Sequence, residues 1–182
     1  MSGHLVKVYH GSLNVVPNPE IRPVDRALDF GVGFYVTSYY EQAKEWAIKK
    51  GLHYGQPACV NEYVLNLSNL SVKKFKGTSG AWLDFSSTHR NPASYLNIQN
   101  TGYFAPNYAN GHHEYDVVYG EMADDRVYQV IELYRVGDEK GTKLSKEEAI
   151  TMLKFYKLTD QYLLHTTKAI SQLQFIRIMR VF

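Results

Sequence analysis

The sequence predicts a single domain of the α+β class that spans residues 1–182. Strand-like segments are dispersed among short helical ones, without the regular β-α-β alternation that builds a doubly wound parallel sheet. No glycine fingerprint for a dinucleotide follows any of these strands. With 182 residues, of which 45% are apolar, the chain is long enough to bury a substantial core, and no repeat or low-complexity tract divides it.

The first half of the chain predicts two strands and then one amphipathic helix. Residues 5–9 alternate apolar and polar side chains, as a half-buried strand does. A glycine-containing turn at 29–33 leads into an aromatic and β-branched strand at 34–37. A helix follows, with Ser38 as its expected N-cap and with its end near Gly51.

Turn residues and helix caps separate the elements of the second half. Ser145 and Glu148 have the spacing of a capping box. Asp124 and Asp125 stand where a helix begins, so an N-cap role is favoured over catalysis for them. Residues 97–113 have no steady period and predict an exposed loop. The expected elements are strands at 60–67, 71–75, 115–120, 159–166 and 175–182, and helices at 79–88, 123–134, 145–156 and 168–172.

Composition excludes some classes of function and favours others. The formal net charge of +2 is too small to indicate nucleic-acid binding by itself. Fifteen tyrosines suggest a wet cleft or a partner surface, with simple surface decoration as the alternative. The one cysteine, Cys59, cannot form an intramolecular disulfide and fits a reducing compartment.

No segment predicts secretion, membrane insertion or metal binding. The N-terminus lacks the apolar core of a signal peptide, and no run approaches ~18 apolar residues, so a cytoplasmic location without a membrane partner is expected. His112, His113 and Glu114 are the only tight group of possible metal ligands. Neighbouring residues on an extended segment point to opposite sides, so we expect no metal there.

The stretch 29–47 is the strongest candidate for function. Gly31 and Gly33 bracket a bend before the strand, and Trp46 follows at helical spacing in the next helix. A glycine turn beside a strand, with aromatic side chains arriving from a helix, can hold a flat ring while backbone amides contact its edge. Filling of the core by these aromatic residues is the alternative.

A second segment, His10-Gly11-Ser12, ends the first predicted strand. Together with Gly31-Val32-Gly33-Phe34-Tyr35 and with Trp46 eleven residues beyond Tyr35, it resembles the ADP-ribosyltransferase superfamily. The branch concerned includes diphtheria toxin and the poly(ADP-ribose) polymerases, which carry a tyrosine at the position of Trp46. The longer string around these motifs is most similar to a bacterial family of small ADP-ribosyltransferase-like domains, over most of the chain.

The resemblance implies two small, mostly antiparallel sheets with an NAD cleft between them. It also implies that His10 hydrogen-bonds a ribose hydroxyl, that the backbone of Gly11 holds the carboxamide, and that Tyr35 and Trp46 sandwich the nicotinamide. A neutral imidazole suffices for the first of these roles. The implied catalytic residues are His10, Tyr35 and Gln161, and the implied NAD-binding residues are Gly11, Ser12, Gly31, Gly33, Phe34 and Trp46.

Two positions depart from the superfamily pattern. Gln161 stands where relatives carry a glutamate that orients the ribose and stabilises the cationic transition state. A glutamine can accept a hydrogen bond but brings no charge, so Gln161→Glu is expected to preserve or raise activity. Asp160 is the nearest substitute carboxylate, but strand alternation points it away from the face of Gln161. Ala43 replaces a serine that bonds the carboxamide in the polymerases.

Three functions follow from the resemblance. The first is transfer of one ADP-ribose unit from NAD to a macromolecular acceptor, as in a bacterial toxin, with an antitoxin as partner, or in an antiphage effector. Polymer synthesis is disfavoured because the elongating glutamate is absent. The second is a catalytically silent domain that binds a nucleotide or a partner, and the third is NAD hydrolysis.

Overall fold

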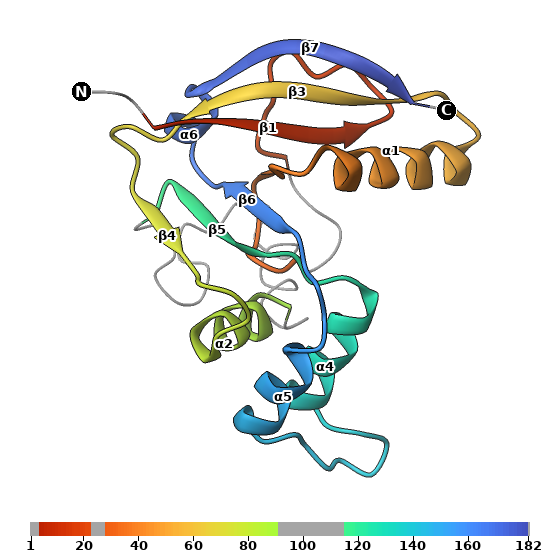
Figure 1. Ribbon diagram of the computed structural model, residues 1–182, viewed down its shortest axis with the longest axis vertical. Helices are drawn as coiled ribbons and strands as arrows, with labels where there is room; N and C mark the ends of the chain where they lie inside the picture. Colours follow the sequence, from red (N-terminus) through yellow and green to blue (C-terminus); the bar gives the residue numbers. More distant parts are fainter. Residues whose placement is uncertain (1–3, 23–27, 91–114, 182) are drawn as a thin grey trace.

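A computed structural model of the protein describes residues 4–22, 28–90 and 115–181. The fold is α+β, with two mostly antiparallel sheets, as the sequence predicts. In Figure 1 the sheet that contains β1, β3 and β7 lies above the sheet that contains β4, β5 and β6. We call these the upper and the lower sheet.

The upper sheet has the order β1-β3-β7 and is antiparallel throughout. Its strands are β1 (Leu5–Ser12), β3 (Ala58–Asn66) and β7 (Leu173–Val181). Because β1 pairs with β3 along its whole length, the His10-Gly11-Ser12 motif stays in extended conformation opposite Asn61, Val60 and Cys59.

The lower sheet has the order β2-β6-β5-β4 and contains one parallel pair, β4 with β5. Its strands are β2 (Phe34–Val36), β4 (Val72–Lys74), β5 (Val117–Glu121) and β6 (Asp160–Leu164). Strand β2 lies at the edge and pairs with β6, so Tyr35 stands opposite Leu163. All four sequence-predicted strands exist here, each shifted or shortened at its ends.

Apolar side chains fill three clusters, which define the layers. One cluster joins the upper and lower sheets through Val8, Phe34, Tyr63 and Leu164. A second joins the other face of the lower sheet to α2, α4 and α5, which lie at the bottom of Figure 1. The third lies between the upper sheet and α1. The helices are α1 (Tyr40–Tyr54), α2 (Gly80–His89), α4 (Asp125–Arg135), α5 (Lys146–Leu153) and α6 (Thr167–Ile170).

Two of the three predicted N-caps are confirmed. The carboxylate of Asp124 accepts hydrogen bonds from the backbone amides at the start of α4, and Ser145 forms a capping box with Glu148 at the start of α5. The prediction for α1 is wrong, because its N-cap is Tyr39, without a side-chain cap. Ser38 instead donates from Oγ to Asp160 Oδ2 at 2.5 Å.

Helix α1 also runs beyond the predicted end near Gly51. It continues to Tyr54 and ends at Gly55, which adopts the left-handed conformation of a C-cap with φ of 61°. A helix interior tolerates one glycine at a modest cost when packing favours the helix, so Gly51 was a weak stop signal. The predicted loop at 97–113 and the group His112 to Glu114 lie outside the described residues.

Candidate functional site

The two sheets are joined next to His10 by a backbone bridge. The amide of Tyr9 donates to the carbonyl of Thr37 at 2.8 Å, and the amide of Thr37 donates to the carbonyl of Tyr9 at 3.0 Å. This bridge places the C-terminal part of β1 against the free edge of β2. The two motifs are 25 residues apart in the chain, and the fold brings them side by side.

His10 is held in one tautomer by the edge of β2. Its Nδ1 lies 2.8 Å from the carbonyl oxygen of Tyr35, and its ring packs on Phe34 with centroids 4.5 Å apart. A carbonyl oxygen can only accept, so Nδ1 carries the proton and donates. In the neutral ring Nε2 is then an acceptor, which is the form that can receive a hydrogen bond from a ribose hydroxyl.

The surroundings of His10 keep its ring neutral. Burial lowers the pKa of His10 from 6.5 to about 4, the Tyr35 carbonyl opposes this shift, and the nearby charge of Lys50 adds to it. Desolvation disfavours the imidazolium, and no carboxylate among the described residues pairs with it. Near neutral pH His10 is therefore a hydrogen-bonding group, and a role as proton carrier is not required.

This lowered pKa predicts a pH dependence of stability. The unfolded chain binds a proton at His10 below pH 6.5, whereas the folded state does so only near pH 4. Stability should therefore fall as pH decreases from 6.5 toward 4. The free energy of unfolding, measured by urea titration at several pH values, should decrease more in the wild type than in His10→Gln. Parallel curves for the two proteins would contradict the shift.

The turn before β2 fixes the side chain of Tyr35. Its hydroxyl donates to the carbonyl of Gly31 at 2.7 Å and accepts from the amide of Phe30 at 3.2 Å. Gly31 has φ of 93°, which favours glycine, and Gly33 lies so close to Leu163 that a larger residue would clash. The ring of Tyr35 packs against the cluster formed with α2, α4 and α5. Tyr35 is thus part of a rigid turn.

Gly11 is the point where α1 lies closest to β1. A Cβ atom at this position would stand 2.1 Å from the carbonyl oxygen of Ala43 and 3.0 Å from the amide nitrogen of Ala47. The glycine therefore allows the helix backbone to lie against the strand. The next residue, Ser12, accepts a hydrogen bond from the amide of Asn14 through Oγ, at 3.2 Å.

Trp46 lies on α1 and is 37% exposed. The ammonium groups of Lys49 and Lys50 lie 5.7 and 5.4 Å from the centre of its ring. Lys50 also acts electrostatically on His10, although the His10 ring packs on Phe34 of the lower sheet whereas α1 packs on the other face of the upper sheet. The two aromatic residues predicted to sandwich the nicotinamide thus differ, because Tyr35 is fixed in its turn and Trp46 is partly exposed.

Gln161 and Asp160 occupy opposite faces of β6, as strand alternation predicts. Gln161 donates from Nε2 to Asp29 Oδ2 at 2.8 Å and to the carbonyl of Glu121 at 3.3 Å. Asp160 accepts from Thr37 Oγ1 and from the amide of Ser38 through Oδ1, at 3.0 and 2.8 Å. Gln161 therefore lies on the face of the lower sheet turned toward α2 and α4, whereas the ring of His10 packs on the other face.

The structure adds two carboxylates that sequence reasoning gave no role. Asp29 is buried and touches Gln161 directly. Glu121 stands opposite Asp160 in the register of β5 and β6, and burial together with the charge of Asp160 raises its pKa. Asp29 belongs to the motif stretch, so its position was visible in the sequence, but its contact with residue 161 depends on the tertiary fold.

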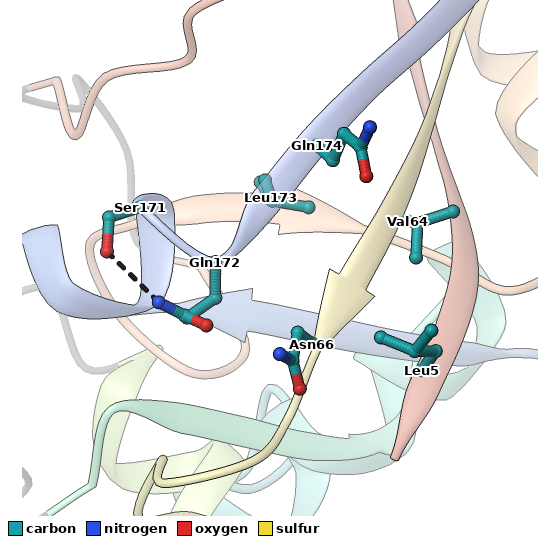
Figure 2. A pocket seen from close by; sticks show the side chains of 7 residues that line it. All are labelled: Leu5, Val64, Asn66, Ser171, Gln172, Leu173 and Gln174. Atoms are coloured by element: carbon teal, nitrogen blue, oxygen red, sulfur yellow. Dashed lines mark hydrogen bonds between the residues drawn. The ribbon is translucent and has the colours of Figure 1, made fainter. Parts of the chain in front are cut away.

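A pocket shown in Figure 2 lies away from these residues. It is at the Leu5 end of β1, whereas His10 lies toward the opposite end of the same strand. Its lining residues are Leu5, Val64, Asn66, Ser171, Gln172, Leu173 and Gln174. Within 4–22, 28–90 and 115–181, no group of three or more histidine, cysteine, aspartate or glutamate side chains could hold a metal.

Fold and site together define an α+β protein in which a neutral histidine at the end of one sheet is hydrogen-bonded to the edge of another. The family model described as "Protein of unknown function (DUF3990)" matches residues 6–175. The chain belongs to this family. No curated protein matches it. In the described part of the chain, no helix is both long and apolar enough to cross a bilayer.

Proposed function

We propose that the protein transfers ADP-ribose from NAD to a macromolecular acceptor. The observation that carries this proposal is the contact of His10 Nδ1 with the Tyr35 carbonyl at 2.8 Å. It joins the two segments on which the resemblance to ADP-ribosyltransferases rests, and it turns Nε2 into an acceptor for a ribose hydroxyl. A role as a toxin or antiphage effector, with an antitoxin as partner, belongs to the same proposal.

In the proposed reaction the bond between the nicotinamide nitrogen and the anomeric carbon breaks, and its electron pair leaves with neutral nicotinamide. Positive charge develops on the ribose until a nucleophile of the acceptor bonds to the anomeric carbon and loses a proton. His10 would orient the ribose through Nε2, and Trp46 would stack on the nicotinamide ring. Stabilisation of the cation requires negative charge or dipoles near the ribose.

A silent binding domain is the second candidate, and one observation favours it. Gln161 replaces the glutamate of active relatives, and its Nε2 is already used by Asp29 and by the Glu121 carbonyl. NAD hydrolysis is the third candidate, because water can take the place of the acceptor. Transfer and hydrolysis share the NAD site and differ in the fate of the ribose, whereas the silent domain would bind a nucleotide or a partner without chemistry.

Incubation of the purified protein with NAD labelled on the adenylate separates these candidates. Label attached to protein or nucleic acid of a bacterial extract supports transfer, whereas free ADP-ribose without attached label supports hydrolysis. Binding of NAD by calorimetry without either product supports the silent domain. Failure of the wild-type protein to bind NAD at millimolar concentration would overturn the proposal.

Replacement of Trp46 by alanine should weaken NAD binding. Stacking of a ring on an aromatic side chain contributes ~1–3 kcal/mol, so affinity measured by calorimetry should fall about fivefold or more. Tyr54→Ala is the matched control, because Tyr54 is an exposed aromatic residue on the same helix. Equal affinity of the wild type and Trp46→Ala would remove Trp46 from the site.

A further inference from the structure

Asp160 is a buried carboxylate at the start of β6, with 8% of its surface exposed. Its Oδ1 accepts from the amide of Ser38 at 2.8 Å and from Thr37 Oγ1 at 3.0 Å, and its Oδ2 accepts from Ser38 Oγ at 2.5 Å. Burial of a carboxylate is costly unless hydrogen bonds compensate for the lost water. These three hydrogen bonds come from two neighbouring residues, so the carboxylate fixes one short segment of the chain.

This segment is the place where the chain leaves the lower sheet. Strands β2 and β6 pair as far as Val36 opposite Tyr162, and in the same register Ser38 would stand opposite Asp160. The ladder stops before that position, and the side chain of Asp160 binds the Ser38 amide in place of a backbone partner. The carboxylate thus extends the attachment of β2 to β6 as far as Ser38, directly before the N-cap of α1.

The same segment carries the contact between the two sheets next to His10. The backbone of Thr37 exchanges two hydrogen bonds with that of Tyr9, the neighbour of His10 on β1. Two residues before Thr37, the carbonyl of Tyr35 accepts from His10 Nδ1. A displacement of Thr37 would therefore move β1 relative to the carbonyl to which the histidine donates.

We infer that Asp160 is a positioning residue for His10. Its carboxylate holds Thr37 and Ser38, and this segment keeps the Tyr35 carbonyl within reach of Nδ1, so that Nε2 remains the acceptor. Where NAD is concerned, the inference rests on the proposed function, which assigns a ribose hydroxyl to that acceptor. Asp160 itself acts only through the backbone and touches no substrate.

The tautomer of His10 tests the structural part of the inference without any ligand. Two-bond 1H–15N spectra at neutral pH distinguish a ring nitrogen that carries a proton from one that does not, and wild-type His10 should carry its proton on Nδ1. In Asp160→Asn one carboxylate oxygen becomes an NH2 group, which cannot accept, so the attachment of Ser38 loosens. The His10 signals should then move toward those of a ring protonated partly on Nε2. His10→Gln identifies these signals by their absence.

His165 and His89 serve as internal controls in the same spectra. Each has its Nδ1 at 2.7 Å from a backbone carbonyl, that of Val32 for His165 and that of Phe85 for His89. His165 directly follows β6, so it would respond if the substitution disordered this strand as a whole. A change confined to His10 supports the inference. Unchanged signals of His10, or a change at either control as large as that at His10, would overturn it.

A milder substitution answers the question if Asp160→Asn does not fold. Ser38→Ala removes the hydroxyl that bonds to Oδ2 and keeps the amide that bonds to Oδ1. The His10 signals should therefore move in the same direction by a smaller amount, and Ser38→Thr, which retains a hydroxyl, should restore them. Wild-type His10 signals in Ser38→Ala would refute the role of the carboxylate.

The functional part of the inference is measured as release of nicotinamide from NAD. Misplacement of an orienting group by about 1 Å can cost up to ~100-fold, so Asp160→Asn should lower kcat/KM at least about tenfold. Asp116→Asn is the matched control, because Asp116 directly precedes β5 and likewise accepts from a backbone amide, at Ser71, and from a hydroxyl, at Thr166. The control should change kcat/KM less than about threefold. Equal losses in the two variants would reduce Asp160 to a structural residue.

Failure of this inference can be told from failure of the proposed function. The spectra require no NAD, so they decide whether Asp160 positions His10 even if the wild type does not bind NAD. A protein that turns over NAD but shows no response of His10 to Asp160→Asn contradicts only the inference. A protein that does not bind NAD contradicts the proposed function, and the functional part of the inference is then wrong with it.

Discussion

His10→Ala is expected to lower NAD turnover at least about thirtyfold. The substitution removes both the donor to the Tyr35 carbonyl and the Nε2 acceptor proposed to contact the ribose. A hydrogen bond to a group that gains charge in the transition state contributes about 2 kcal/mol or more, which corresponds to roughly thirtyfold in kcat/KM. The measurement is release of nicotinamide by the wild type and the variant at saturating and limiting NAD.

His89→Ala is a matched control for this experiment, because the two histidines have similar packing. The ring of His89 packs on Phe85 with centroids 4.3 Å apart, and its Nδ1 contacts the Phe85 carbonyl at 2.7 Å. The control removes a stacked histidine and its contact with a carbonyl from α2, away from the place where β1 contacts β2. Activity should survive in His89→Ala, and wild-type turnover in His10→Ala would refute the role of His10.

Local patterns predicted those parts of the fold that depend on neighbours in sequence. The capping box at Ser145 and the cap at Asp124 are confirmed, because a cap is formed by residues within one turn of each other. Ser38 also matched a cap pattern, yet its hydroxyl bonds to Asp160, which lies 122 residues away. A tertiary partner of this kind cannot be seen in a local pattern.

In the candidate site, too, the sequence predicted some features, whereas others depend on tertiary contacts. The resemblance selected His10 and Tyr35, and the structure places them in contact, although the proposed roles remain predictions. It did not reveal that Gln161 is bonded to Asp29, since that contact joins residues 132 apart. Which face of β6 carries Gln161 followed from alternation, but the layer that covers this face followed only from the packing of α2 and α4.

The second large effect is expected at Gly11, where the strand and the helix share one tight contact. In Gly11→Ala the new Cβ would stand 2.1 Å from the Ala43 carbonyl oxygen, far inside contact distance. The oxygen belongs to the backbone and the position of a Cβ is fixed by its own backbone, so neither atom can move by a change of rotamer. Helix α1 must shift away from β1, and overpacking of this kind costs about 1–3 kcal/mol or more.

The shift of α1 should reach the ligand site as well, because Trp46 and Lys50 are on the same helix and Lys50 acts on His10. Gly11→Ala is therefore expected to lower the melting temperature and NAD affinity together, measured by calorimetry on the same samples. Gly80→Ala is the control, since its Cβ would meet only side-chain ends, those of Lys146 at 2.7 Å and of Ile150 at 3.5 Å, and no backbone atom is among its three nearest neighbours. If Gly11→Ala is as stable as Gly80→Ala and binds NAD like the wild type, α1 does not pack on β1 as described, and the proposed connection between this contact and the NAD site fails.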